Sequence, residues 1–442
     1  MNYPLSLLLV LFFVSLDTFA QDLVLSGKVA DSNSSEVIPF ANLRIQKKNN
    51  GTVTNEHGEF ELHLAQSNIK DTLIVSCIGY NYLKIPISTI IGSKKNVLLQ
   101  LVPRSYGLNE VVIKPNQGPT AADIVQKALE KIGDNYLTEP ILMDGFYREY
   151  FEENGSFVGF AEAAVSIYDA TGYAPLSDKK AKKTKFKDNE IIAVNQLRVS
   201  DIRNQGDYVL YIDLNYALRS NLLRNANYWQ EYANDMNAKT VLLNIDKLTY
   251  LDKDMVYIIS YNIDGKRAGT YKGRLFIRAN DYAVLRVEID ADNSENNREL
   301  NGAPNKTHAI LTYQEQNGKW CLNYINAYHE VNYVLNDKKY ALRFHSELTI
   351  NRVESGNVQP LVLADNTLRG SIFYQPRYRT FDPEYWVDYQ LFESSPKNRG
   401  IIADLEKPRL LDQQYRANGK LKSLPPRSSG SINNSKTQLT NY

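Results

Sequence analysis

The chain has 442 residues, which exceeds the usual size of one hydrophobic core and predicts two domains and a tail. Its 51 lysines and arginines balance its 50 aspartates and glutamates. A nucleic-acid-binding protein normally concentrates a basic excess on one face, so this balance argues against nucleic acid as a partner. Cys77 and Cys321 fall in different predicted domains, where each is expected to be a small buried hydrophobe and not half of a disulfide.

Residues 1–20 have the pattern of a secretory signal peptide. Leu5–Leu16 is an apolar run too short to cross a bilayer, and Thr18-Phe19-Ala20 places small residues before a cleavage site. Met1–Pro4 contains no lysine or arginine, which leaves an uncleaved anchor as the competing interpretation. The sequence therefore predicts an exported protein, periplasmic or associated with the outer membrane, with no transmembrane helix after cleavage.

Residues 22–103 are predicted to form a small β-sandwich of the immunoglobulin or transthyretin type. Short strands alternate with turn residues, and no run is long enough for an ordinary helix. Asn55 is expected to nucleate an Asx-type turn, Gly58 to supply a positive φ and Phe60 to return the chain to the core. Gly79 permits a bend after a strand that is apolar on both faces.

The motifs of this module resemble the carboxypeptidase-regulatory-like domain family. They are Gly27-Lys28-Val29, Pro39-Phe40-Ala41-Asn42, Gly51-Thr52-Val53-Thr54, Gly58-Glu59-Phe60, Ile78-Gly79-Tyr80 and Leu108-Asn109-Glu110-Val111-Val112. The resemblance implies an accessory transthyretin-like sandwich, found beside carboxypeptidases and at the N-terminus of TonB-dependent outer-membrane receptors. It implies docking or scaffolding and no peptidase activity. The residues that follow this module lack the pattern of barrel strands, which argues against a TonB-dependent receptor.

After a linker over residues 104–118, residues 119–400 are predicted to form a β-rich α+β domain. Thr120 and Asp123 have the spacing of a helix N-terminus, and Asn154-Gly155 between two β-rich runs predicts a hairpin. Further strands with short polar connections predict an antiparallel meander. The fold class is therefore mainly β, with a large antiparallel sheet that can curve into a half-barrel over covering helices. Only in architecture, this cup is similar to periplasmic lipoprotein-carrier folds.

The strand expected at Tyr340–Ile350 alternates apolar residues with polar ones, among them His345 and Glu347, so one of its faces must be covered. The segment Asp144–Glu149 and Pro383–Trp386 also look similar to an envelope family that joins this sandwich to a β-rich domain, and that resemblance implies no activity. Residues 401–442 are expected to be an extended or disordered tail, because from Asn418 onward large apolar residues are almost absent.

Few side chains carry a specific chemical signal. Arg148, on a predicted strand, could bind an anionic group, although a cross-strand ion pair is the favoured interpretation. A basic loop could contact anionic headgroups, with a solvated loop as the favoured alternative. Its lysines include Lys179, Lys180, Lys182 and Lys183. No catalytic, cofactor-binding or metal-binding residue is predicted, since the histidines lack zinc-peptidase spacing and no nucleophile elbow, phosphate loop or dinucleotide fingerprint occurs.

The leading hypothesis is a non-enzymatic envelope protein whose sandwich docks on an envelope or outer-membrane partner. Its β-rich domain would bind a partner or a ligand, with an apolar lipid or a glycan as candidates. One alternative is a hydrolase of envelope glycan or peptide that uses dispersed carboxylates such as Asp201, Asp207 or Glu288, two of which must then converge in a pocket. A second alternative is a surface adhesion or interaction protein.

Overall fold

The computed structural model describes most of the chain outside its first 22 and last 23 residues. The described residues are 23–91, 96–104, 118–173, 190–203, 217–218, 220–226, 238–265, 269–294, 306–335, 337–362, 367–369, 381–387, 389 and 398–419. The predicted signal peptide, most of the predicted linker, the lysines at 179–183 and Asp207 lie outside them.

The first module is a β-sandwich of two small sheets. One sheet has the strand order β4-β1-β7 and the other has the order β3-β2-β5-β6. The strands are β1 (Leu23–Asp31), β2 (Asn42–Ile45), β3 (Gly51–Val53), β4 (Glu59–Leu64), β5 (Thr72–Ser76), β6 (Leu83–Pro86) and β7 (Val97–Leu101). Apolar side chains from both sheets, such as Leu25, Leu43 and Val75, form one buried core. The predicted sandwich is thereby confirmed.

The turn before β4 has the predicted local chemistry. Asn55 Oδ1 accepts hydrogen bonds at 2.9 Å from the backbone N–H groups of His57 and Glu59. Gly58 has a φ of 68°, a conformation that costs an L-residue roughly 1–2 kcal/mol. Phe60 then points into the core and is fully buried. The side-chain bonds of Asn55 and the glycine at 58 therefore fix how β4 enters the sandwich.

The second module is built on an 11-stranded sheet with the order β11-β12-β13-β14-β15-β16-β17-β8-β9-β10-β18. Every neighbouring pair is antiparallel. The strands are β8 (Ile141–Glu153), β9 (Ser156–Asp169), β10 (Glu190–Val199), β11 (Ala238–Leu251), β12 (Asp254–Gly265), β13 (Gly269–Arg278), β14 (Val284–Asp292), β15 (Lys306–Gln316), β16 (Lys319–Leu335), β17 (Lys338–Ser355) and β18 (Thr367–Arg369). The meander β11 to β17 pairs back onto β8, so the middle of the sheet joins strands far apart in sequence.

Local signals in this module agree with the structure. Asn154 and Gly155 have φ values of 49° and 84°, as a two-residue hairpin turn between β8 and β9 requires. Thr120 and Asp123 form a capping box at the start of helix α2 (Ala121–Glu130). Helix α3 (Ile132–Asn135) follows. The predicted hairpin and helix are confirmed.

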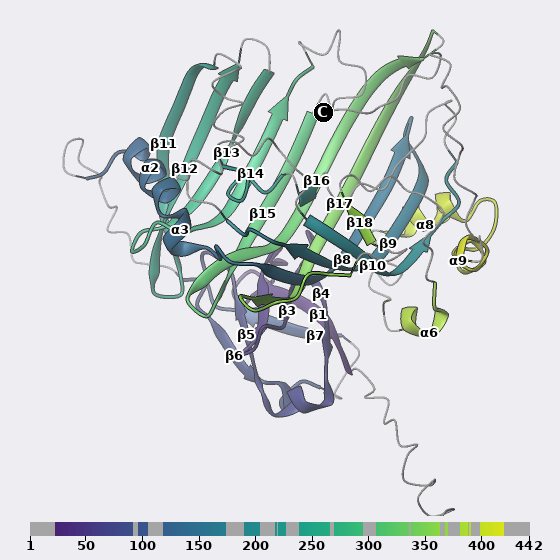
Figure 1. The fold of residues 1–442 in the computed structure, drawn as a ribbon, viewed down its shortest axis with the longest axis horizontal. Coiled ribbons are helices and arrows are strands. Elements are labelled where there is room, and N and C mark those ends of the chain that lie inside the picture. Colours follow the sequence, from purple (N-terminus) through teal and green to yellow (C-terminus); the bar gives the residue numbers. More distant parts are fainter. Residues whose placement is uncertain are drawn as a thin grey trace, which may run out of the picture.

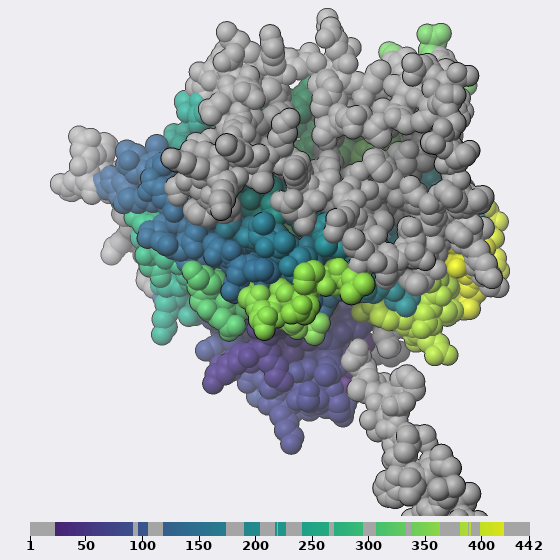
Figure 2. Space-filling model, viewed as in Figure 1, coloured from purple at the N-terminus to yellow at the C-terminus, as the bar shows by residue number. Residues whose placement is uncertain are grey.

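The large sheet is covered on both faces. Helices α2 and α3 pack with the larger hydrophobic core on one face, near the β11 end (Figure 1). The sandwich packs on the opposite face through β3, against β16 and β17, and protrudes beneath the large domain (Figure 2). Three helices lie beside β9 and β10 at the other end of the sheet. They are α6 (Pro383–Trp386), α8 (Arg399–Leu405) and α9 (Leu411–Gly419).

Helices α8 and α9 correct the expectation that the chain is extended from residue 401. Ile401, Leu405, Leu411 and Tyr415 recur at helical spacing and pack as a separate cluster on Phe160 of β9. The loss of large apolar residues begins only at Asn418, at the end of α9, so the tail boundary predicted at residue 401 was too early. Among the described residues, no helix is long and apolar enough to cross a membrane.

Candidate functional site

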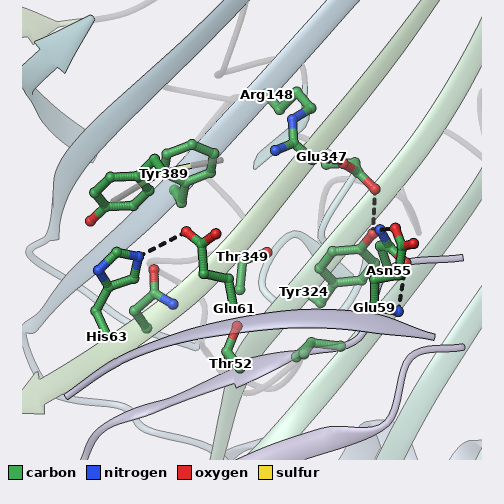
Figure 3. A pocket seen from close by; sticks show the side chains of 13 residues that line it. Thr52, Asn55, Glu59, Glu61, His63, Arg148, Tyr324, Glu347, Thr349 and Tyr389 are labelled. Carbon is green, nitrogen blue, oxygen red and sulfur yellow. Dashed lines mark hydrogen bonds and ion pairs between the residues drawn. The ribbon is translucent and has the colours of Figure 1, made fainter. Parts of the chain in front are cut away.

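The two modules meet along a polar interface, here called the seam, where strands β2 to β5 of the sandwich lie over β8 and β14 to β17 of the large sheet. A cavity of about 60 Å³ lies in the seam. Its walls include Thr52, Glu61 and His63 from the sandwich and Arg148 and Glu347 from the sheet (Figure 3). The cavity has room for a few water molecules and is too small for an acyl chain.

A buried ion-pair network forms the sheet side of the seam. Arg148 Nε donates to Glu162 Oε1 at 2.6 Å, and Arg148 also pairs with Glu347 Oε2 at 3.2 Å. Arg198 Nε donates to Glu162 Oε2 at 2.5 Å. Glu162 is fully buried and Arg198 is 4% exposed. Two arginines and two glutamates thus neutralise one another across β8, β9, β10 and β17.

The electrostatics of Arg148 reflect this pairing. Burial by itself lowers the pKa of its guanidinium, but the charges of Glu162 and Glu347 outweigh that effect and raise the pKa. Arg148 therefore remains charged at any physiological pH. The sequence left two interpretations of Arg148, a site for an anionic group and a cross-strand ion pair. The structure places Arg148 between two carboxylates of the chain itself, in register with Glu162 on β9 and with Glu347 on β17.

An aromatic and polar layer continues from Glu347 toward the sandwich. Tyr324 donates from its hydroxyl to Glu347 Oε1 at 2.8 Å. Next to them, the His345 ring stacks on Tyr328, with ring centroids 3.9 Å apart, and the Tyr328 hydroxyl donates to Glu56 of the sandwich at 2.7 Å. The polar face expected on this strand is therefore buried in its middle: His345 is 3% and Glu347 is 8% exposed.

The sandwich contributes its own polar side chains. His63 Nε2 lies 2.9 Å from Glu61 Oε1, and the His63 ring stacks on Tyr389, with centroids 4.0 Å apart. Glu59 pairs with Lys28 at 3.1 Å. Each of these two carboxylates has a partner within its own module, and the charge of Glu61 also acts across the seam on Arg148.

Backbone hydrogen bonds also join the modules. Gly79 donates its N–H to the Tyr250 carbonyl at 2.7 Å, and Asp252 donates to the Tyr80 carbonyl at 3.2 Å. The Tyr80 hydroxyl donates to Asp31 at 3.0 Å within the sandwich. The motif that contains Gly79 and Tyr80 thus contacts the end of β11 and the turn after it, a contact that the motif itself does not indicate.

The predicted carboxylates do not converge. Asp201 follows β10 and pairs with Arg409 at 2.8 Å, whereas Glu288 is on β14 and pairs with Arg274 at 2.6 Å. In the sheet, β10 and β14 are separated by β15, β16, β17, β8 and β9. Within the described residues, no cluster of three or more histidine, cysteine or acidic side chains is arranged to hold a metal ion.

Comparisons with known proteins identify the first module. Residues 25–113 match the family described as CarboxypepD_reg-like domain. A stretch of 113 residues is 32% identical to the TonB-dependent receptor SusC of Bacteroides thetaiotaomicron. The match covers 24% of this chain, and the chain spans about one ninth of that receptor, 11% of its length.

Solved structures resemble this chain only weakly. A Vibrio parahaemolyticus domain assigned as an outer membrane lipoprotein-sorting protein aligns with 54% of this chain and 95% of its own length, with 9% identity and a TM-score of 0.25. A LolA superfamily protein from Nitrosomonas europaea aligns with 55% of this chain and 96% of its own, with 10% identity and a TM-score of 0.21.

The family match and the sequence identity over the N-terminal residues agree with the observed sandwich. The first module of this mainly β protein, at residues 25–113, is therefore a CarboxypepD_reg-like domain.

Proposed function

We propose that this chain is a non-enzymatic binding and scaffolding protein of the bacterial envelope, in which the sandwich is held on the large sheet and presents its outer edge to a partner. The observation that carries the proposal is the seam. Its ion-pair network of Arg148, Arg198, Glu162 and Glu347 is internally paired, and the cavity beside this network is too small for a macromolecular substrate. This network therefore serves assembly of the two modules.

Distance argues against the hydrolase alternative with Asp201 and Glu288. Six strand-to-strand steps separate the strands that carry them, which at about 4.8 Å per step places them roughly 29 Å apart. Glycosidase carboxylates act on one bond from about 5–10 Å apart. Asp201 also has its pKa lowered by hydrogen bonds from Arg409, which favours a charged carboxylate over a proton donor.

Strand β7 is one of the edge strands of the sandwich. In the described sheet, β7 pairs only with β1, in parallel. Leu98 on this strand is 60% exposed, and Val102 just after it is 55% exposed. An edge strand with exposed apolar side chains can accept an extended segment of a partner, which adds a strand to the sheet. We assign docking of an envelope protein to this edge.

A pull-down from native envelopes tests the proposal. The full chain is used as bait, with Leu98→Lys as the edge variant and Leu410→Lys as the matched control, since Leu410 is 58% exposed near α9 and far from β7 in the fold. We expect the wild type and the control to retain one envelope protein that the edge variant loses. Equal recovery by all three chains would refute docking through β7.

Location and ligand need separate measurements. Cell fractionation tests export to the periplasm or outer membrane, and cleavage by a protease added to intact cells would favour the adhesion alternative. Native mass spectrometry of the protein purified without delipidation tests for a bound lipid. A spectrum with only the mass of the polypeptide would remove the apolar-ligand version and leave the scaffolding function standing.

A further inference from the structure

A second cavity in the seam has a different character from the first. Its volume is about 70 Å³, and it lies between β2 and β5 of the sandwich and β14, β15 and β16 of the sheet. Phe40, Cys77 and Tyr82 line it from one module, and Leu285 and Trp320 from the other. It is therefore a chamber whose walls come together only when both modules are in place.

Several polar atoms around this cavity are buried and have no hydrogen-bond partner among the described residues. They are Asn42 Oδ1, Arg286 Nε, Thr312 Oγ1, Trp320 Nε1 and Asn323 Oδ1. Asn323 is 1%, Trp320 is 4% and Thr312 is 8% exposed. Buried polar groups in folded proteins are nearly always paired, so an unpaired set around one cavity points to a bound molecule that completes the bonds.

The backbone directs these groups to one place. The register between β15 and β16 passes from Thr312↔Tyr324 to Tyr313↔Leu322, so Asn323 is the extra residue of a β-bulge. Bulges redirect a side chain and are over-represented beside functional sites. Arg286 on β14 is the register partner of Thr312. The bulge thus places the Asn323 amide next to the Arg286–Thr312 pair.

Charge and aromatic packing define the ligand further. The Arg286 guanidinium pairs with Glu288 at 2.7 Å and lies over the Phe40 ring, 5.0 Å from its centroid, which leaves its Nε–H unused. Arg44 also lines the cavity, and no ion pair joins it to another described residue. Glu315 is a wall residue whose partner at 3.5 Å, Arg278, is shared with Asp281 and Asp254. The cationic groups that can face a ligand on this wall are Arg286 and Arg44.

The unpaired atoms include both hydrogen-bond donors and hydrogen-bond acceptors. Arg286 Nε–H and the Trp320 indole N–H are donors, the amide oxygens of Asn42 and Asn323 are acceptors, and the Thr312 hydroxyl is both. Acetate would satisfy only the donors. A ligand that satisfies all of them carries an anionic group together with a hydroxyl or amino group.

We propose that this cavity binds a small carboxylate that carries its own hydrogen-bond donor, such as an α-hydroxy or α-amino acid. The carboxylate faces Arg286, Arg44 and the Trp320 N–H, and the hydroxyl or amino group donates to the amide oxygens of Asn42 and Asn323. A volume of about 70 Å³ corresponds to roughly two water molecules, which is about the size of glycolate or glycine. This site is independent of the docking edge at β7.

Isothermal titration of the full chain tests the site with glycolate and glycine as probes. Acetate lacks the donor and ethanolamine lacks the carboxylate, so both serve as controls. We expect glycolate or glycine to bind at least tenfold more tightly than acetate, and ethanolamine not to bind. Titration with the dipeptide glycylglycine distinguishes two natural sources of this chemistry. Binding of the dipeptide indicates a peptide C-terminus, and its failure to bind indicates a free acid.

The variant Thr312→Val removes one unpaired hydroxyl with little change of shape. We expect it to weaken binding about tenfold while the melting temperature of the unliganded protein stays the same or rises, because an unsatisfied buried group is removed. Arg44→Gln, at a partly exposed residue, should also weaken carboxylate binding without lowering the melting temperature. Thr349→Val alters the other seam cavity and is the matched control, with unchanged affinity.

Two results would overturn the proposal. One is the absence of binding by both acids at about 10 mM together with a lower melting temperature for Thr312→Val, which would mean that the cavity holds ordered water only. The other is binding that neither Thr312→Val nor Arg44→Gln weakens, which would place the acids elsewhere on the protein.

Discussion

The buried network at the seam permits a sharp test with the substitution Glu162→Gln. This change keeps the shape of the side chain and removes the charge that Arg148 and Arg198 share at 2.6 and 2.5 Å. Breaking a buried pair by removing one partner costs about 3–5 kcal/mol, since an uncompensated charge is left behind. Arg198 loses the carboxylate that it shares with Arg148, and it keeps a hydrogen bond to the Tyr389 carbonyl at 2.9 Å.

The matched control is Glu152→Gln on the same hairpin. Glu152 pairs with Arg343, whose side chain is 58% exposed, and an exposed pair contributes about 0–1 kcal/mol. At roughly 2 °C per kcal/mol for a large domain, Glu162→Gln should melt about 6–10 °C below the wild type and the control within about 2 °C of it. Differential scanning fluorimetry and urea unfolding followed by tryptophan fluorescence measure both. If the two variants melt together, the network does not stabilise the seam.

Further predictions concern pH, backbone and thiols. Burial lowers the pKa of His329 from 6.5 to about 3, so between these pH values the unfolded chain binds one proton more than the folded chain. The free energy of unfolding should therefore fall by about 1.4 kcal/mol per pH unit as the pH drops below 6.5. The variant His329→Gln should flatten this slope in melting curves. Gly58→Ala should destabilise more than Gly155→Ala in urea titrations, because both have positive φ but only at Gly58 would the new Cβ lie 2.9 Å from a backbone oxygen; equal losses would contradict the steric argument. Burial raises the thiol pKa of Cys77 to about 11 and of Cys321 to about 12. At pH 8 the reaction with maleimide should therefore be about 100-fold slower for Cys77 and about 1000-fold slower for Cys321 than for a free thiol, and fast labelling of Cys321 before unfolding would disprove its burial.

Features that depend on adjacent residues could be predicted from the sequence. The Asn55–Gly58 turn, the hairpin at Asn154 and the capping box at Thr120 each need only a few neighbouring side chains and a compatible φ. Alternation along β17 located the strand correctly. The turn, hairpin and capping motifs act over four residues or fewer, and the alternation lies within a single strand, so each pattern is written in one stretch of sequence.

The seam could not be predicted because its partners are far apart in the chain. Arg148 and Glu347 are separated by 199 positions, and the layer around His345 is buried only because the sandwich and the adjacent strands cover it. Alternation says that one face is polar, and it does not say what lies on that face. The bulge at Asn323 has no turn residue to mark it, so the second cavity also left no signal in the sequence.

The order of the modules along the chain has a consequence for folding. Residues 23–104 come first, but the surface of their sandwich that carries Glu56 rests on β16 and β17, which are formed by residues 319–355. Contacts of such high sequence separation form slowly. Until β16 and β17 have formed, the sandwich can exist only with this surface open to water, and the two chambers of the seam stay open.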